Sequence, residues 1–253
     1  MVHYGQPNNT HPPALAVPAV SVTCSKVQLK EQKRAMKTPC TDILRCPEFS
    51  DVYPPSEDSF LFLDALEKDV LFLKSLDPAI SLDIGSGSGI IGAFLHSLGV
   101  SRFHVATDIS RFACLASIRV LMSNIHEETT VAFDAIQCTL AIPFLGRLDS
   151  SVDLIMFNPP YVPTPIDEHR SVGCSIRATW SGGNCGREVI DEFLPQAVRL
   201  LSPSGCLYLL LSDANIPTEV HAAIKKLSGD QLSPTTILRR DSFGEALGVY
   251  RYS

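Results

Sequence analysis

Hydrophobic positions fall into two kinds of segment that alternate along most of the chain. In one kind, apolar residues recur every three or four positions, which is typical of a helix with one buried face; these segments are 59–76, 89–98, 111–123, 186–201 and 218–227. The other kind is a short apolar run, typical of a buried strand; these runs are 79–84, 103–107, 130–133, 152–157, 206–211, 235–238 and 247–252. The alternation predicts an α/β fold with a doubly wound, Rossmann-like, mostly parallel sheet of seven strands.

Residues 1–35 lack such periodicity and contain four prolines and a polar run, so we expect them to be disordered. Residues 1–48 are therefore assigned to an N-terminal extension, and residues 49–253 to one catalytic domain. Met36 is a candidate alternative translation start. Within the domain, Pro195 lies inside a helical segment and should kink it or restart it. Glu57 and Asp58 precede the first helix, where acidic residues are favourable; Glu57 is equally compatible with a functional role.

Composition narrows the possible functions. The 253 residues are 45% hydrophobic, enough for one continuous core, and the net charge of −6 disfavours tight binding of nucleic acid. A neutral or basic substrate suits this charge better. The eight cysteines form no C-x-x-C pair and the histidines have no metal-ligand spacing, so we expect free thiols and no metal. The chain has neither a signal peptide nor an apolar run of about 20 residues, so we expect it in the cytoplasm or also the nucleus.

A glycine-rich loop follows the first predicted strand. Gly85, Gly87 and Gly89 allow the backbone to pass close to a bound ligand, and we expect all three to line a cofactor site. A dinucleotide is an alternative, but its G-x-G-x-x-G pattern places the third glycine one residue later. Asp83, just before the loop, would repel a pyrophosphate and attract the ammonium group of a methionine moiety.

Asp108 ends the second predicted strand. In doubly wound folds, a carboxylate at this position accepts both hydroxyls of an adenosine ribose. The alternative is that Asp108 merely caps the helix that begins near Ser110. Together with Asp83 and the glycine loop, Asp108 favours S-adenosyl-L-methionine as the cofactor.

The tetrapeptide Asn158, Pro159, Pro160 and Tyr161 follows the fourth predicted strand, at the sheet edge where ligands bind. An Asn-Pro turn can be a simple strand terminator. Two prolines, however, fix the direction of the Pro159 carbonyl, and the Asn158 amide offers a second acceptor oxygen. The two oxygens can accept both hydrogens of one NH₂ group, while Tyr161 can stack on a flat group.

This arrangement suits methyl transfer to a planar nitrogen. The lone pair of an amide or exocyclic amine is delocalised, so the nitrogen is a poor nucleophile. Two fixed acceptors stabilise the positive charge that develops on it as it attacks a methyl carbon. Because the methylated nitrogen can lose its proton to water, the step requires neither a metal nor a general base.

With these motifs, the chain resembles class I S-adenosylmethionine-dependent methyltransferases of the HemK type. The segments 51–60 (DVYPPSEDSF) and 180–189 (WSGGNCGREV) are similar to the eukaryotic branch, which methylates the glutamine of a Gly-Gly-Gln motif in the translation termination factor. The resemblance runs from about Phe49 to the C-terminus. Asn-Pro-Pro-Tyr alone is shared with adenine and cytosine amino-methyltransferases, so the other two segments carry the narrower assignment.

The resemblance implies roles for individual residues and a partner. It implies contacts with the cofactor or the target nitrogen for Ser59, Asp83, Gly85, Asp108 and Asn158. It also implies an obligate heterodimer partner, a small zinc-binding activator protein that covers an apolar surface. Where the family has an Asp-Leu pair at the adenine amine, this chain has Thr139-Leu140. The Thr139 hydroxyl can accept one hydrogen bond, and Asp134 is the alternative acceptor.

Several alternatives stay open at this point. The tetrapeptide is also compatible with methylation of DNA adenine, and a slender pocket could admit an unprotonated lysine. A non-catalytic scaffold that binds the termination factor is a fourth hypothesis, in which Thr139 marks a decayed cofactor site. The segment 162–185 is long enough to cover a substrate as a lid, and Trp180 within it is either part of that lid or a core anchor.

Overall fold

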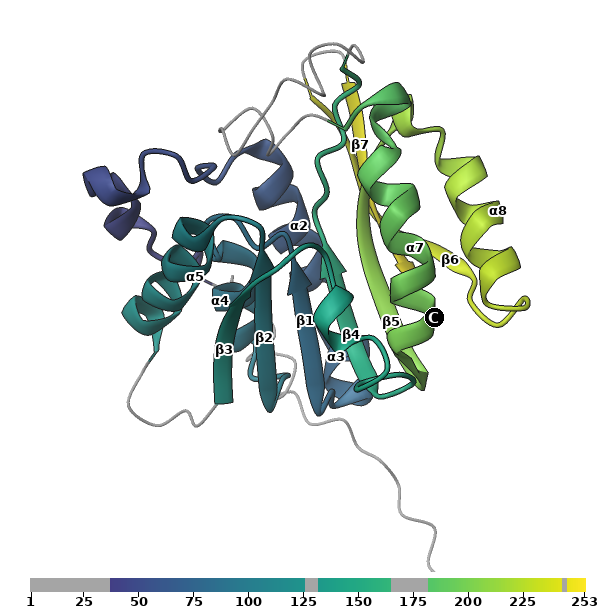
Figure 1. Cartoon of the computed structure of the whole chain (residues 1–253), viewed down its shortest axis with the longest axis horizontal. Helices are drawn as coiled ribbons and strands as arrows, with labels where there is room; N and C mark the ends of the chain where they lie inside the picture. Colours follow the sequence, from purple (N-terminus) through teal and green to yellow (C-terminus); the bar gives the residue numbers. More distant parts are fainter. Residues whose placement is uncertain (1–36, 126–131, 165–181, 243–244) are drawn as a thin grey trace, which may run out of the picture. The chain divides into compact units, whose positions relative to one another are not determined.

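Seven strands form one sheet in the order β3-β2-β1-β4-β5-β7-β6 (Figure 1). The computed structural model describes residues 37–125, 132–164, 182–242 and 245–253. Strands β1 to β5 are mutually parallel, and β7 runs antiparallel to both of its neighbours. The expected seven-stranded, mostly parallel sheet is therefore confirmed. The strands are β1 (Ile80–Ile84), β2 (Phe103–Asp108), β3 (Ala132–Gln137), β4 (Val152–Phe157), β5 (Leu201–Ser212), β6 (Pro234–Ser242) and β7 (Glu245–Tyr252).

Helices pack on both faces of this sheet. Helix α4 packs against α2 and α5, and α7 packs against α8. Successive side chains of a strand point to opposite faces of the sheet, so two neighbouring residues of β2 show what packs on each face. Val105 belongs to the core cluster that contains the buried residues of α7 and α8, whereas His104 lies against Gly92 of α4. The helices are α2 (Glu57–Lys68), α3 (Val70–Leu76), α4 (Ile90–Ser97), α5 (Arg111–Asn124), α7 (Glu188–Leu200) and α8 (Pro217–Leu227).

The segment 59–76, expected to be one helix, is two helices that meet at Asp69. Asp69 has φ −101° and ψ 15°, outside the helical conformation, and it separates α2 from α3. Its carboxylate accepts a hydrogen bond from the Tyr208 hydroxyl at 2.7 Å and pairs with Arg251. Contacts with two strands therefore override a hydrophobic pattern that is continuous in the sequence.

Helix α7 runs unbroken from Glu188 to Leu200, so the expected restart at Pro195 does not occur. Phe193, Leu194 and Ala197 are buried in the main core cluster. Burial of this apolar face stabilises the helix, while the proline removes only one internal hydrogen bond.

Residues before Phe49 also take part in the ordered unit, which begins at Lys37. Two 3-10 turns, η1 (Asp42–Arg45) and η2 (Pro47–Phe49), lie against α5. Phe49 is buried there beside Ala116. The expected disordered extension to residue 48 therefore overlaps this ordered part, because the apolar side chains of the turns find a partner surface on α5. Residues 1–36, with the expected disorder and the candidate start at Met36, lie outside the described residues.

Within the described parts of the chain, every helix is too short or too polar to cross a bilayer.

Candidate active site

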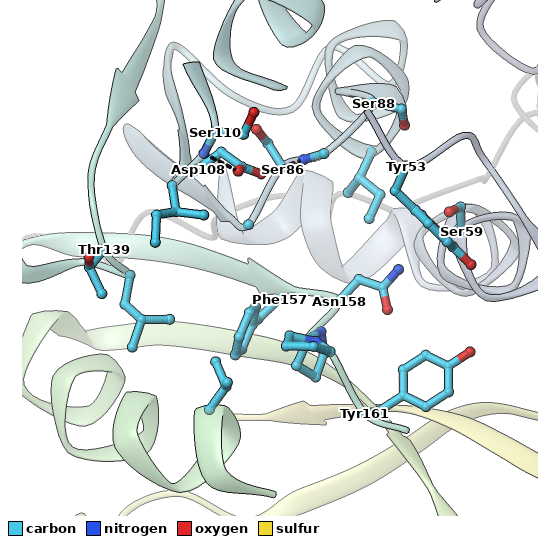
Figure 2. A pocket seen from close by; sticks show the side chains of 18 of the residues that line it. Tyr53, Ser59, Ser86, Ser88, Asp108, Ser110, Thr139, Phe157, Asn158 and Tyr161 are labelled. Carbon is cyan, nitrogen blue, oxygen red and sulfur yellow. Dashed lines mark hydrogen bonds between the residues drawn. The ribbon is translucent and has the colours of Figure 1, made fainter. Parts of the chain in front are cut away.

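A cavity of about 780 Å³ opens at the carboxyl ends of β1, β2 and β4. Residues from the loops that follow these strands and from the start of α2 line it (Figure 2). Ten predicted site residues line it, namely Ser59, Gly85, Gly87, Asp108, Thr139, Leu140, Asn158, Pro159, Pro160 and Tyr161. Asp83 and Gly89 do not form part of this wall. The contacts of all twelve with a cofactor or substrate stay a prediction.

The glycine loop leaves β1 in a conformation that favours glycine. Gly85, Gly87 and Gly89 have φ values of +63°, +52° and +75°, in the left-handed region. Gly89 also has a packing role, because a Cβ atom there would lie 2.3 Å from the Cα of Ser117 in α5. It thereby lets α4 and α5 approach closely behind the loop.

Asp108 shapes the loop as well as the cavity. One carboxylate oxygen accepts a hydrogen bond from the Gly87 amide at 3.0 Å, and the other accepts one from the Ser110 amide at 2.8 Å. Burial raises the pKa of this carboxyl above its usual value. Each oxygen keeps a second lone pair, so Asp108 can serve both the helix start and the ribose hydroxyls of a ligand.

Asp83 lies behind the loop and is 1% exposed. Its Oδ2 atom has no hydrogen-bond partner among the described residues. Burial, reinforced by repulsion from Asp108, raises the pKa of Asp83 to about 8. A cation brought close to this carboxyl would stabilise its charged form, which is the electrostatic condition for recognising an ammonium group.

The side-chain amide of Asn158 has a fixed orientation. Its Nδ2 donates a hydrogen bond to Oδ2 of Asp58 at 3.0 Å. The other Asp58 oxygen accepts the backbone N–H of Ser59 at 2.8 Å, and Asp58 is 5% exposed. The Asn158 Oδ1 atom is buried and has no donor among the described residues. In Figure 2, the Asn158 amide lies between Ser59 and Tyr161.

Asp58 and Tyr53 are site residues that the sequence analysis missed. Both line the cavity. Tyr53 is half-buried, and its pKa is raised by burial and by the charge of Asp58. Glu57, the neighbour for which a functional role was considered, is exposed and does not line the cavity. The available signal was the helix start at residues 57–58, which identifies an N-terminal turn but not which of its carboxylates points inward.

Thr139 and Leu140 lie at the cavity wall after β3. Asp134, the alternative adenine acceptor, is exposed in β3 and does not line the cavity. Its Oδ1 atom accepts the N–H of the next residue, Ala135, at 2.8 Å. Gln137 lines the wall instead, and its Nε2 donates to the Ile109 carbonyl at 3.0 Å.

The segment after Tyr161 is tied to residues that lie 20 positions further along the chain. The Gly182 amide donates to the Val162 carbonyl at 2.8 Å, and the Thr164 amide donates to the Gly183 carbonyl at 3.0 Å. The Thr164 hydroxyl accepts the Gly183 amide at 3.0 Å. We call these four residues the neck. Residues 165–181, with Trp180 and most of the expected lid, lie outside the described residues.

The described residues contain no group of three or more His, Cys, Asp or Glu side chains that could hold a metal ion.

Comparison with known proteins gives close relatives. No family model matches the chain. Methyltransferase HEMK2 of Mus musculus is 41% identical over 207 residues, which cover 81% of this chain and 91% of the relative. The eRF1 methyltransferase catalytic subunit mtq2 of Schizosaccharomyces pombe is 35% identical over 227 residues, covering 85% of this chain and 95% of that protein.

Among solved structures, a chain of the E. cuniculi Mtq2–Trm112 complex matches with a TM-score of 0.56 and 30% identity. The match covers 80% of this chain and 98% of the solved one. That complex is responsible for methylation of the eRF1 translation termination factor.

Proposed function

Because the chain belongs to the HemK2/Mtq2 family of eRF1 methyltransferases, we propose that it transfers a methyl group from S-adenosyl-L-methionine to a glutamine side-chain amide of eRF1. The glutamine is that of the Gly-Gly-Gln motif. The observation that carries the proposal is the oriented Asn158 amide. Its nitrogen donates to Asp58, and its oxygen has no donor in the part of the chain that the structure describes.

The residues around the cavity fit the cofactor. The Asp83 oxygen, for which the described ranges of the chain supply no partner, suits an ammonium group, and Asp108 suits two ribose hydroxyls. Left-handed glycines at 85 and 87 leave the loop backbone open to close approach. When bound, S-adenosyl-L-methionine supplies an electrophilic methyl group on a sulfonium.

The chain's own residues bind and polarise the target amide. Asn158 Oδ1 and the Pro159 carbonyl would accept its two N–H groups and so fix the position and orientation of the nitrogen in the cavity. A buried acceptor is stabilised by a hydrogen bond, so the Asn158 oxygen is suited to receive the arriving N–H group. As charge develops on nitrogen, both hydrogen bonds strengthen, and the proton then leaves to water.

The alternatives are less well supported. Duplex DNA requires neutralisation of its phosphates, which a chain of net charge −6 does poorly. A scaffold without catalysis has no need of a buried carboxylate with a raised pKa behind a glycine loop. An unprotonated lysine fits the same acceptors but offers no delocalised nitrogen that would require two of them.

We also propose that an activator of the Trm112 type covers an apolar area near β2, α5 and the edge strand β3. Large hydrophobic side chains are exposed in this region, namely Phe103, Ile109, Met122 and Ile125. Each of the four belongs to or adjoins β2 or α5, and exposed apolar side chains on elements beside an open strand edge favour a protein partner.

The test is methylation of eRF1 by the full chain co-expressed with a Trm112-type subunit, with labelled S-adenosyl-L-methionine. Peptide mass spectrometry should locate one methyl group on the Gly-Gly-Gln glutamine. Asn158→Ala should lower kcat by about 10²–10³, the usual loss for one electrostatic contact in a transition state, with cofactor affinity nearly unchanged. Asn184→Ala, at an exposed asparagine that does not line the cavity, is the matched control. Label on DNA alone, or full turnover by Asn158→Ala, would overturn the proposal.

A further inference from the structure

Asn215 has a completely buried side-chain amide, whose oxygen and nitrogen both have hydrogen-bond partners. It lies at the end of η6 (Asp213–Asn215), directly after β5, and has 0% exposure. Its Oδ1 accepts the Ser212 amide at 2.8 Å. Its Nδ2 donates to three backbone carbonyls, those of Tyr161 at 2.8 Å, Cys185 at 3.0 Å and Gly186 at 3.1 Å.

These partners belong to three different segments. Tyr161 ends the tetrapeptide after β4, Cys185 and Gly186 form the turn before α7, and Ser212 ends β5. The paired register of β4 and β5 stops at Phe157 and Leu209. Beyond that pair, the Asn215 side chain, which follows β5, donates a hydrogen bond to the Tyr161 carbonyl after β4 and so links the two strand ends.

The backbone segments that Asn215 joins also pack closely against one another. A Cβ atom on Gly186 would lie 1.9 Å from the Tyr161 carbonyl oxygen, and one on Gly182 would lie 2.6 Å from that of Pro160. The two tetrapeptide carbonyls are thus confined by glycines on one side and, at Tyr161, held by Asn215. Asn215 itself does not line the cavity, so it has no contact with a ligand there.

We propose that Asn215 is a positioning residue for methyl transfer, which holds the backbone at Tyr161 so that the Asn158 and Pro159 acceptors keep their geometry. This inference rests on the proposed function. Misplacing reacting groups by about 1 Å can cost roughly 10²-fold in rate, although the residue responsible is remote from the chemistry. The hydrogen bonds of Asn215 involve none of the residues proposed to hold the cofactor, so we expect cofactor affinity to depend little on them.

The informative substitution is Asn215→Asp. It keeps the size of the side chain but replaces the donor with a carboxyl that faces three carbonyl oxygens. Burial and these dipoles raise the pKa of such a carboxyl, and only its protonated form can donate one hydrogen bond. The kcat of the variant relative to that of the natural protein should therefore fall as pH rises, to about a hundredfold loss. Cofactor affinity from calorimetry should change by less than about threefold, a factor that corresponds to under 1 kcal/mol.

Asp213→Asn is the matched control, because it changes an exposed residue of the same turn that pairs with Arg239. The rate of the natural protein tests the proposed function, and the ratio of the variant's kcat to the natural kcat at each pH tests the positioning role, so the two proposals can fail separately.

Asn215→Ser, which keeps one donor, replaces the Asp variant if that one does not fold. A folded variant with the natural kcat at high pH would overturn the inference. Failure of both variants to fold would also overturn it, since Asn215 would then be a determinant of folding only.

Discussion

Asp58 and Asn158 are 100 positions apart in the sequence and 3.0 Å apart at their hydrogen-bonded atoms. We expect Asp58→Ala to lower kcat by about ten- to a hundredfold, because the Asn158 amide would lose the acceptor that fixes its orientation. Cofactor affinity should be less affected. Steady-state kinetics with eRF1 and calorimetry with the cofactor separate the two quantities.

Glu57→Ala is the control for this prediction, since Glu57 is exposed in the same helical turn. Asp58→Asn should retain part of the activity, because its amide oxygen can still accept the Asn158 N–H. An equal loss in the Glu57 and Asp58 variants would mean that the helix start, and not the Asp58–Asn158 hydrogen bond, is what matters.

Asp83 gives cofactor binding a pH dependence. With a pKa of about 8 in the free protein, this carboxyl is mostly protonated at pH 6 and increasingly charged as pH rises. Affinity for S-adenosyl-L-methionine should therefore increase between pH 6 and 7.5, below the range in which the ligand's own ammonium group loses its proton. Asp83→Asn should bind about tenfold or more weakly at pH 7.5, since a charge-assisted hydrogen bond contributes about 1.5–3 kcal/mol.

Calorimetric titration across this pH range, with both proteins in the same buffers, is the measurement. The affinity of the Asn variant should be nearly independent of pH. A natural protein whose affinity is flat from pH 6 to 7.5 would show that Asp83 is not the group that meets the ammonium.

Residues that belong to local motifs could be predicted, and residues defined by distant contacts could not. Asn158 and Asp108 follow strands in recognisable patterns, and both line the cavity. Asn215 has no motif around it, and its role follows from three carbonyls that come together only in the folded chain. Gly89 fits the loop pattern but faces α5, because a pattern fixes the backbone turn and not what each glycine packs against.

At the scale of elements, α4 and β2 make contact through a position that tolerates only glycine. A Cβ atom on Gly92 would lie 2.6 Å from Nε2 of His104, which is 2% exposed. Helix propensity alone predicts that Gly92→Ala gains about 1 kcal/mol. We expect the opposite, a loss of about 1–3 kcal/mol from overpacking, measured by urea unfolding.

A double-mutant cycle with His104→Ala identifies the cause. Removing the ring makes room for the new methyl group, so the two changes together should cost less than the sum of the single changes. Additive costs would place the strain elsewhere. His104 is a buried core residue, and burial lowers its pKa to about 3.

Element boundaries were least predictable where strands are polar. Strand β3 extends to Gln137 beyond the apolar run that indicated it, and the edge strand β6 begins at Pro234 and ends at Ser242. Both are edge strands, where one side of the ladder is open and hydrophobic alternation is not required. The central strands β1 and β4 carry nearly continuous apolar runs, and their predicted bounds agree closely with the structure.

For the whole molecule, cofactor binding should appear as added thermal stability. A ligand that binds only the folded state at about 100 times its Kd contributes about 2.7 kcal/mol. In a domain of about 200 residues this corresponds to a rise in Tm of roughly 5–10 °C. Differential scanning fluorimetry with S-adenosyl-L-methionine should show this rise for the natural protein and for Asn158→Ala, and a smaller one for Asp83→Asn. No shift in the natural protein, with its activator present, would favour a decayed cofactor site.

The parallel sheet could be predicted because it depends on the alternation of helices and strands along the whole chain. Alternating helices and strands of this length allow few arrangements other than a parallel sheet covered on both faces. The position of β7 between β5 and β6 did not follow from that alternation. It depends on the hairpin that the last two strands form and on the pairing of β7 with β5 along Leu207 to Ser212.

The neck has a consequence for how this enzyme can diversify. Val162 and Thr164 are hydrogen-bonded across to Gly182 and Gly183, so these four positions are fixed relative to one another next to the tetrapeptide. A change in the length or composition of residues 165–181 should therefore leave the tetrapeptide in place, because the bonds of the neck lie between the two. Sequence variation in residues 165–181 during evolution is thus compatible with an unchanged Asn-Pro-Pro-Tyr geometry.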